Sequence, residues 1–429
     1  MSSPSANATQ AVRSSRHGAW PFWAAYVLIL LLAPLVWRDS FARSMLCQMG
    51  IAIIACLAFN ILFGQAGLVS FGHAVYSGLG SFAGIHALQA LGDGRLSFPV
   101  SLVPLIGGLA GLLAAAVLGS FSVRRAGTPF AMISLGVAEL VFALSLMLPE
   151  YFGGEGGLAA NRVVGPTVLG ISFGPQIEVY YLIAAYALTC TVAVHALTRT
   201  PFGHLLQAVR ENPERSEFIG YSAARLRYTA FVLSGFFSGI AGGLAAILFE
   251  LVTPEVLSTT RSASYLLFVF LGGATVFGGP ILGAVLMVLS LVLLSEWTQA
   301  WLLYLGLAFV LMVILAPAGL AGLLRDLASR LPALMQRGRA AWWWALLQLG
   351  LPVLLAGAGL VGLVEMLYHR QLSLAMGPQL KLLGMHWDVD APVSWLVALA
   401  CLIPGAAWAR WAWRRHAATL CPADQPPGA

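Results

Sequence analysis

The chain has 429 residues, of which 59% are hydrophobic and only 9% are charged. A soluble globular chain carries about 25% charged residues, so this composition excludes a soluble multidomain enzyme and indicates a polytopic helical membrane protein. The net charge of +6 comes almost wholly from arginine, because Lys381 is the only lysine. The arginines flank apolar segments, as orientation signals do, so the basic balance does not indicate a nucleic-acid partner.

The five cysteines are scattered along the chain, with no CxxC pair and no histidine at ligand spacing. They therefore predict neither a disulfide framework nor a metal site. The first 19 residues are polar and lead into an apolar run without a clear small-residue cleavage site. We interpret residues 1–19 as a cytoplasmic tail and the apolar run as a retained first span.

Candidate membrane segments of roughly 20 apolar residues recur along the whole chain. In order they are Trp20–Trp37, Ser44–Phe63, Gly72–Leu91, Phe98–Phe121, Pro129–Leu148, Val179–Leu197, Tyr228–Phe249, Ala263–Ser295, Trp301–Ala316, Ala341–Leu367 and Pro392–Trp413. They predict an all-α polytopic fold with about 10 to 12 membrane segments. The last two belong to a C-terminal extension, residues 326–429, whose role the sequence does not indicate.

The arginines between the spans predict the orientation of the chain. With Arg13 and Arg16 in the cytoplasm, six spans bring the charged stretch Arg199–Arg227 to the same side, and four spans do the same for Arg124 and Arg125. Cytoplasmic loops carry the excess of arginine, so these positions agree with one another. The N-terminus, and the C-terminus after the two extra spans, are expected in the cytoplasm.

Two glycine-rich breaks interrupt apolar sequence, one in each half. The first runs from Gly64 to His73 and the second from Gly272 to Pro280, inside the 33-residue segment Ala263–Ser295. One unbroken helix of that length would measure about 50 Å, too long for one span, so we expect a re-entrant loop or two short, broken spans. Paired breaks favour a transporter with inverted repeats, although glycine also simply lets helices pack closely in lipid. The candidate pathway or gating residues in the breaks are Gly64, Gly67, Ser70, Gly72, His73, Gly272, Gly273, Gly278 and Gly279.

Glu139 and His73 are the polar side chains inside apolar segments that merit a functional hypothesis. A carboxylate within a span indicates function by default, and its alternative is a packing residue paired with a neighbouring helix. His73 is either a substrate or proton contact or a hydrogen-bonded residue at a helix start. The long loop Pro149–Glu178, with Gly153, Gly154 and Gly157, is either a docking or gating cap or a solvated connector.

The chain has no phosphate-binding loop, because the GxxxxGK[ST] pattern needs a Gly-Lys pair and Lys381 follows a leucine. If nucleotide hydrolysis drives this protein, another chain supplies it. No catalytic constellation is present in the sequence, so we expect a protein that is not an enzyme.

Four sequence blocks stand out along the chain. They are GQAGLVSFGHAVYSGLGSFAG from Gly64, FGGEGGL from Phe152, TPFGHLLQAVRENPERSEFIG from Thr200 followed by YTAFVLSGFFSGIAGGL, and YLLFVFLGGATVFGGPILGA from Tyr265 followed by APAGLAGLL. These blocks resemble those of the permease subunits of bacterial branched-chain amino-acid ABC transporters of the LivM type. Together they cover roughly Trp20 to Arg325. The resemblance implies that residues 20–325 form the permease domain.

The resemblance also implies that the stretch Arg199–Arg227 contains a cytoplasmic coupling helix, which docks in a cleft of an ATPase subunit. Such a helix needs an apolar ridge for contact and charged flanks for register. The candidate coupling residues are Phe202, Gly203, Leu205, Leu206, Val209, Arg210, Glu211 and Gly220. Arg215-Ser216 replaces the small Ala-Ala pair usual in the motif, which puts the docking geometry in doubt. Pro213 predicts that one helix ends near Arg210 and another begins near Asn212.

By this resemblance the chain is a permease subunit that works by alternating access in the bacterial inner membrane and imports leucine, isoleucine and valine. Its expected partners are a second, LivH-like permease, two ATPase subunits that use the ATP, a periplasmic solute-binding protein and membrane lipid. No cofactor of its own is expected. A permease for urea, short amides or other amino acids would carry similar blocks. An ion-coupled secondary transporter or channel is the alternative from another class, and the scarcity of carboxylates inside the spans speaks against it.

Overall fold

The computed structural model describes residues 22–123, 125, 127–166, 172–298, 300–316, 318–326, 351–352, 355–370, 379–382, 385–388 and 391–420. Outside these residues lie the expected tail 1–19, Arg124, and residues 341–350 and 353–354 of the expected span Ala341–Leu367. The described part is mostly helical and divides into two units. The first comprises Met1–Leu293 with Phe309–Gly322, and the second Leu294–Ala308 with Leu323–Ala429.

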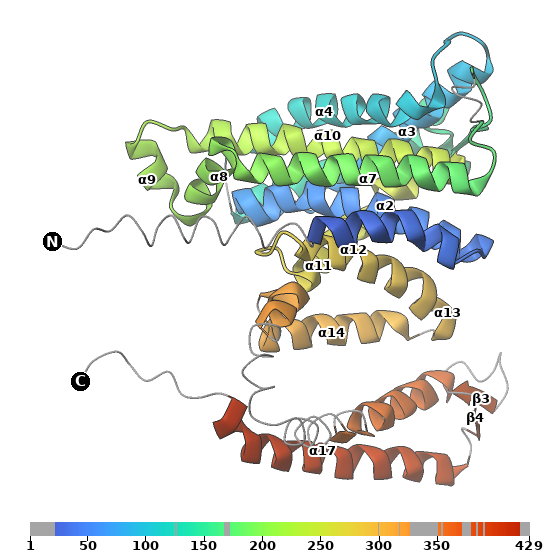
Figure 1. Ribbon diagram of the computed structural model, residues 1–429, viewed down its shortest axis with the longest axis vertical. Helices are drawn as coiled ribbons and strands as arrows, with labels where there is room; N and C mark the ends of the chain where they lie inside the picture. The colour runs from blue at the N-terminus through green and yellow to red at the C-terminus, as the bar shows by residue number, and fades with distance from the viewer. Residues whose placement is uncertain are drawn as a thin grey trace. The chain divides into compact units, whose positions relative to one another are not determined.

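A helical bundle forms the body of the first unit (Figure 1). Its helices are Phe22–Val36, α2 (Ser40–Asn60), α3 (Ala74–Gly92), α4 (Val103–Ser122), α5 (Thr128–Met147), α7 (Gln176–Arg199) and α10 (Ala223–Phe249). α10 packs against α2, α3 and α4, and α2 also packs against α7.

Glycines at four-residue spacing allow α10 to approach α4 closely. Gly107 and Gly111 in α4 face Gly235, Gly239 and Gly243 in α10, and a Cβ atom on Gly239 would lie 2.2 Å from the carbonyl oxygen of Gly107. Small residues at this spacing let helix backbones meet in lipid, where the hydrophobic effect gives no preference for helix contact over lipid contact. Glycine therefore serves as a packing residue in this pair of helices.

Five described helices are long and apolar enough to cross a membrane. They are Ser40–Ala66, Val100–Ser122, Thr128–Met147, Gln176–Arg199 and Ala223–Phe249. The bent pair Trp301–Ile314 and Gly319–Asp326 makes a sixth if it is one span, and Phe22–Val36, Gly279–Leu294 and Pro392–Gly405 are shorter apolar helices. The expectation of a multi-pass helical membrane protein is confirmed.

The expected segment Ala263–Ser295 is not one helix. It forms α11 (Thr259–Gly272) and α12 (Gly279–Val288), which pack against each other, with a turn between them at residues 273–278. A π-helical turn (Leu289–Leu294) and the short α13 (Ser295–Trp297) follow, and then α14 (Trp301–Leu315), within which the division between the units falls.

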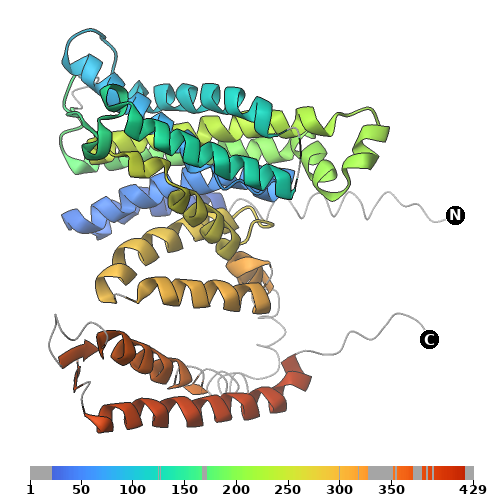
Figure 2. The same cartoon turned by 180° about the vertical axis from the view of Figure 1, so that it is seen from behind.

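The two ends of the bundle carry different structures (Figures 1 and 2). At one end α8 (Pro201–Glu211) and α9 (Pro213–Phe218) connect α7 to α10. At the other end lie α6 (Pro149–Phe152) and the strand β1 (Leu158–Ala159), which pairs antiparallel with β2 (Leu251–Val252). The 3-10 turn Pro254–Leu257 then leads into α11.

In the second unit the helix at 355–370 packs against α17 (Pro392–Leu420), and the strands β3 (Gln379–Leu382) and β4 (Met385–Asp388) pair antiparallel. Met366 and Ala398 are buried together in the contact of the two helices. Glu365, which is also buried, accepts hydrogen bonds from Thr298 and from the Tyr304 hydroxyl group, the latter at 3.2 Å. This carboxylate is satisfied within its own unit.

Candidate functional site

The charged stretch between α7 and α10 folds into short helices, each begun by a side-chain cap. The side chains of Thr200, Asn212 and Ser222 accept hydrogen bonds from the backbone N–H groups of Gly203, Arg215 and Arg225 at the starts of α8, α9 and α10. Such caps satisfy N–H groups that the helix itself leaves without partners. α8 ends at Glu211 and α9 begins at Pro213, so the predicted boundary between Arg210 and Asn212 is confirmed.

The apolar face of α8 points toward the bundle of its own chain. Leu206 and Val209 are buried, with 1% and 0% of their surface exposed, while Phe202 and Leu205 are half-buried. Gly203 lies against the end of α7, where a Cβ atom would be 2.5 Å from the carbonyl oxygen of Thr198. In this position Leu206 and Val209 hold α8 on the bundle and are not available to another protein. Glu211 is exposed at the end of the helix.

Two polar side chains of α8 fasten it to the first glycine-rich break. The Arg210 guanidinium donates a hydrogen bond to the carbonyl oxygen of Gly64, and Gln207 Nε2 donates to Gln65 Oε1 at 2.8 Å. The stem of Arg210 lies over Gly67, where a Cβ atom would be 2.9 Å from its Cγ. A hydrogen bond with a charged donor is stronger than a neutral one, so Arg210 is the firmer tie.

An exposed apolar group follows α9. Phe218, Ile219 and Tyr221 have 90%, 70% and 46% of their surface exposed, on either side of Gly220, whose φ is +96°. Gly220 adopts a backbone conformation that other residues rarely enter, which turns the chain from α9 toward α10. We call Phe218, Ile219 and Tyr221 the α9 patch. The sequence reasoning missed its two apolar residues, although they stand out within a charged stretch.

The first break interrupts α2 and ends in buried polar groups. α2 continues as a π-helical turn, Ile61–Ala66, which stops at Gly67 with φ of +69°. Asn60 Oδ1, Ser70 Oγ and both ring nitrogens of His73 are buried and have no hydrogen-bond partner among the described residues. Buried polar atoms are normally paired, so each of these atoms is a place where water or another small polar molecule would find a partner.

Neighbouring helices support the backbone of this break. Ser134 of α5 accepts a hydrogen bond from the Phe71 N–H at 3.0 Å, and Ser262 of α11 accepts one from the Ala74 N–H at 3.0 Å. Gly72 lies against α5, where a Cβ atom would be 2.3 Å from the carbonyl oxygen of Ser134. The ring of His73 is enclosed by the rings of Phe59, Tyr76 and Tyr265, and the nearest centroid, that of Phe59, is 5.2 Å away.

The second break consists of glycine backbones in direct contact. A Cβ atom on Gly279 would lie 1.8 Å from the carbonyl oxygen of Gly273, and one on Gly272 would lie 2.1 Å from that of Gly279. Gly273 has φ of +106° and also meets Gly319, while Gly278 is less crowded. The two breaks are adjacent, because a Cβ atom on Gly64 would be 2.7 Å from the carbonyl oxygen of Ala274.

Glu139 connects α5 to the start of α11. The Thr259 hydroxyl group donates a hydrogen bond to Glu139 Oε1, and Glu139 is itself exposed on the surface of the chain. The carboxylate is thus paired with a neighbouring segment, and its functional role stays a prediction. Its exposure within an apolar span also leaves the second carboxylate oxygen open to other groups.

The long loop at the opposite end of the bundle is folded onto the end of α10. Gly153, Gly154 and Gly157 all have positive φ, and a Cβ atom on Gly157 would be 2.3 Å from the carbonyl oxygen of Val252. Arg162 donates its backbone N–H to Glu250 Oε1 at 2.8 Å, and its guanidinium lies 3.9 Å from Glu250 Oε2. With the pairing of β1 and β2, these contacts form a clasp between the loop and residues 250–252.

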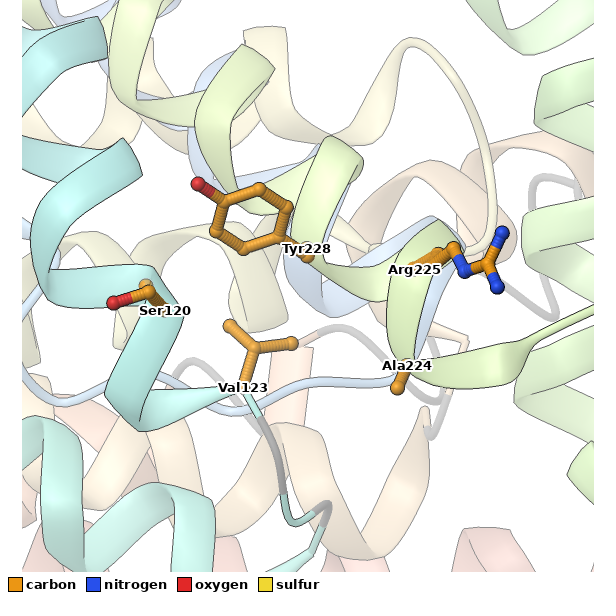
Figure 3. A pocket seen from close by; sticks show the side chains of 6 residues that line it. Ser120, Val123, Ala224, Arg225 and Tyr228 are labelled. Atoms are coloured by element: carbon orange, nitrogen blue, oxygen red, sulfur yellow. The ribbon is translucent and has the colours of Figure 1, made fainter.

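A cavity of about 280 Å³ lies between the ends of α4 and α10 (Figure 3). It is lined by Ser120 of α4, Val123 just after α4, and Ala224 and Tyr228 of α10, and the guanidinium of Arg225 points away from it. The Tyr228 hydroxyl group donates to the carbonyl oxygen of Ala116 at 3.0 Å. The cavity therefore offers mainly apolar walls. Among the described residues, no group of three His, Cys, Asp or Glu side chains is placed to hold a metal ion.

Comparison with known proteins gives a consistent result. Residues 41–317, more than half of the chain, match the family described as branched-chain amino acid transport system / permease component. The chain is similar to the high-affinity branched-chain amino acid transport system permease proteins LivM of Salmonella typhimurium and Escherichia coli. It is 29% identical to the first over 70% of this chain and 75% of the relative, and 30% identical to the second over 64% and 68%.

A more distant relative is named for a different solute. The fructose import permease protein FrcC of Rhizobium meliloti is 26% identical over 43% of this chain and 51% of its own length. No solved structure matches the chain.

Proposed function

Because the chain belongs to the family of branched-chain amino-acid transport permease components, we propose that it carries leucine, isoleucine or valine across the membrane as a subunit of an ABC importer. It is a multi-pass membrane permease and not a catalytic subunit. The names of the LivM relatives, at 29% and 30% identity, support the choice of cargo. The fructose permease shows that relatives move other solutes, so urea, short amides and other amino acids are the competing cargoes.

Membership in this family implies ATPase and binding-protein partners. We propose the full assembly as this chain, a related second permease, two ATPase subunits on the cytoplasmic face and a periplasmic solute-binding protein. The membrane is the bacterial inner membrane, and both termini lie in the cytoplasm. The permease domain covers residues 20–325 and contains an inverted repeat, and the extension 326–429 brings the total to about 10 to 12 membrane segments.

One observation carries the proposed mechanism: α8 is hydrogen-bonded through Arg210 to the carbonyl oxygen of Gly64 in the first break. A displacement of the α8–α9 segment therefore pulls directly on the interrupted end of α2. The first break touches the second at Ala274, so a pull that originates at the ATPase reaches both. In this proposal the residues of the two breaks line or gate the pathway, and the coupling region comprises Phe202–Glu211 together with Gly220.

The contact surface for the ATPase is proposed to be the α9 patch. Leu206 and Val209 face inward, whereas Phe218, Ile219 and Tyr221 offer exposed apolar area between charged neighbours. Exposed aromatic and aliphatic side chains on a polar surface are the usual anchors of a helix that docks in a groove. The inward residues then keep α8 rigid enough to transmit the movement.

Cysteine cross-linking tests this surface. In a variant whose five native cysteines are replaced by serine, Ile219→Cys is expected to form a cross-link with a co-expressed ATPase subunit. Leu206→Cys, buried in the same segment, is the matched control and should give none. Ile219→Cys that reacts with a water-soluble maleimide but gives no cross-link in the purified complex would exclude the α9 patch as the docking surface.

Uptake measurements test the cargo and the energy source. Leucine uptake is expected to require ATP hydrolysis by the partner ATPase and to survive collapse of the proton gradient. Uptake that persists without the ATPase and stops with the proton gradient would instead favour the ion-coupled transporter. Competition by urea or short amides at concentrations equal to that of leucine would favour the rival cargoes.

A further inference from the structure

A second cavity lies inside the first unit and has an arginine in its wall. Ser77 and Ser81 of α3 and Arg261 and Tyr265 of α11 supply its polar lining, and Ile51 of α2 and Phe249 of α10 belong to its apolar lining. The same small space thus brings together a cation, three hydroxyl groups and aliphatic and aromatic surface. None of these polar residues was a candidate site residue in the sequence.

The cavity extends from the end of the bundle at β2 toward its interior. Phe249, Leu251 and Val252 line it at that end, whereas Ile51 near the middle of α2 and Ser77 and Ser81 in the first half of α3 line its deeper part. Residues 253–258 carry the chain from the β2 strand to the start of α11 within the bundle. The side chain of Arg261 is exposed on the surface of this chain, and the next residue, Ser262, accepts a hydrogen bond from the Ala74 N–H at the start of α3. Since α3 runs from there to the end of the bundle with the long loop, Arg261 stands within the length of an apolar segment, where membrane proteins rarely place a charge unless that charge has a function.

The partners of Arg261 leave much of its hydrogen-bonding capacity unused. The Tyr265 hydroxyl group and Glu255 are the neighbouring groups that favour its charged form. No ion pair of Arg261 is found within the described part of the chain. A guanidinium has five N–H donors in a planar fork that matches a carboxylate, and one tyrosine hydroxyl group occupies few of them. The Ser258 cap also places the start of α11, with its partial positive charge, beside this position.

The two serines offer the opposite polarity. The Ser77 hydroxyl group donates to the carbonyl oxygen of Ala74 at 3.0 Å, and that of Ser81 donates its one hydrogen to the carbonyl oxygen of Ser77 or of Gly242, both 3.0 Å away. Their hydrogens are thus used within the protein, and their oxygen lone pairs remain as acceptors. Acceptors of this kind suit an ammonium group.

We propose that Arg261 binds the carboxylate of the transported solute, while Ser77 and Ser81 face its ammonium group and the apolar wall receives its side chain. This proposal rests on the proposed function and narrows the cargo to α-amino acids with apolar side chains, excluding urea and neutral amides. The cavity measures about 40 Å³, room for a carboxylate or a few waters but not for a whole leucine. α3, α10 and α11 must therefore separate for the solute to enter.

Protection of a cysteine in the cavity tests the proposal on the assembled transporter without its binding protein. In the cysteine-free background, Ala245→Cys lies in the lining and reports on occupancy through its rate of reaction with a small thiosulfonate reagent. Leucine at millimolar concentration is expected to slow the reaction several-fold, and leucinamide, which lacks the carboxylate, is not.

Substitutions of Arg261 complete the test. Arg261→Gln is expected to weaken the protection by leucine about tenfold or more, because the charge and the paired hydrogen bonds from the guanidinium to the carboxylate are lost. Arg261→Lys keeps the charge and is expected to keep part of the protection. Arg95→Gln, an exposed arginine paired with Asp93, is the matched control and should protect like the parent. Elution of each variant as the intact complex shows that it has folded.

Equal protection by leucine with Arg261→Gln, equal protection by leucinamide, or no protection in a complex that imports leucine would overturn the proposal. Failure of the proposed function gives a different result. A complex that does not import leucine, but whose cysteine is protected by other carboxylates and not by their amides, would refute the cargo and retain the role of Arg261.

Discussion

The two glycine-rich breaks lie against each other but are held in opposite ways. Side chains from distant segments hold the first: Arg210 reaches the Gly64 carbonyl oxygen, Gln207 reaches Gln65, and Ser134 supports Phe71. Backbone contacts hold the second, where Gly272 and Gly279 pack with no room for a side chain.

This difference indicates which break can move. A side-chain hydrogen bond can be exchanged for one to water at a net cost of about 0.5–1.5 kcal/mol, or about 1.5–3 kcal/mol for a charged donor such as Arg210, so the first break can change shape without loss of the fold. Glycine backbones in close contact have no such alternative, because separation leaves a gap that nothing else fills. We therefore expect the first break to change its conformation and the second to stay rigid.

Gly279→Ala should have the largest effect. Its Cβ atom would lie 1.8 Å from the carbonyl oxygen of Gly273, and a backbone atom cannot rotate away. We expect a loss of stability of about 3 kcal/mol or more, which overpacking of this severity produces, with little folded protein recovered. Thermal unfolding of the protein in detergent measures this. Gly136→Ala, where the Cβ atom meets nothing within 4 Å, should unfold like the parent or slightly higher.

Gly64→Ala should have an intermediate effect. The nearest atom to its Cβ, at 2.2 Å, is Oδ1 of Asn60, a side chain that can turn, but the Ala274 carbonyl oxygen at 2.7 Å cannot. We expect a loss of about 1–3 kcal/mol, of which Asn60→Ala in the same chain restores part. Unfolding midpoints of the single and double variants give the comparison. If the double variant is no better than the single one, the side chain of Asn60 is not the adaptable part of the first break.

Substitutions of Arg210 and Gln207, the two side chains that fasten α8, should have the smallest effect on stability. They test the role of these contacts in transport separately from their role in stability. Arg210→Gln loses a charge-assisted hydrogen bond of about 1.5–3 kcal/mol at most, and Gln207→Ala loses an exposed neutral one of under about 1 kcal/mol. We expect Arg210→Gln to lower the number of solutes moved per ATP hydrolysed, with hydrolysis retained, and Gln207→Ala to change this ratio little. An unchanged ratio with Arg210→Gln would show that movement does not pass through this contact.

Local rules predicted the boundaries of the coupling segment well. Pro213 cannot continue a helix but suits the first turn of one, and the ends of α8 and α9 lie where this requires. The second break was predicted in the same way, because an apolar run of 33 residues is too long for one span and its glycines mark the turn. Both inferences depend on residues close together in the chain.

The parts that sequence reasoning missed depend on which surfaces meet in the fold. The spacing of Leu205, Leu206 and Val209 showed an apolar face on α8, but periodicity does not say whether the same chain or another covers it. Because the same chain covers the apolar face of α8, Phe218 and Ile219 are the large apolar residues of this segment that stay exposed. Arg261 stands two residues before the predicted run Ala263–Ser295, where it resembles an ordinary flanking charge, and only the path of residues 250–258 brings it beside Ser77 and Ser81.

The clasp at the far end of the bundle has a consequence for how a signal from outside would travel. Leu158 and Ala159 pair with Leu251 and Val252, and only six residues, 253–258, separate that pairing from the start of α11. Six residues span about 20 Å at full extension, so this connector has little slack. A protein that lifts or presses the long loop therefore also shifts the helix that carries Arg261. In the proposed assembly, docking of a loaded solute-binding protein on this loop would therefore also move the proposed binding position at Arg261.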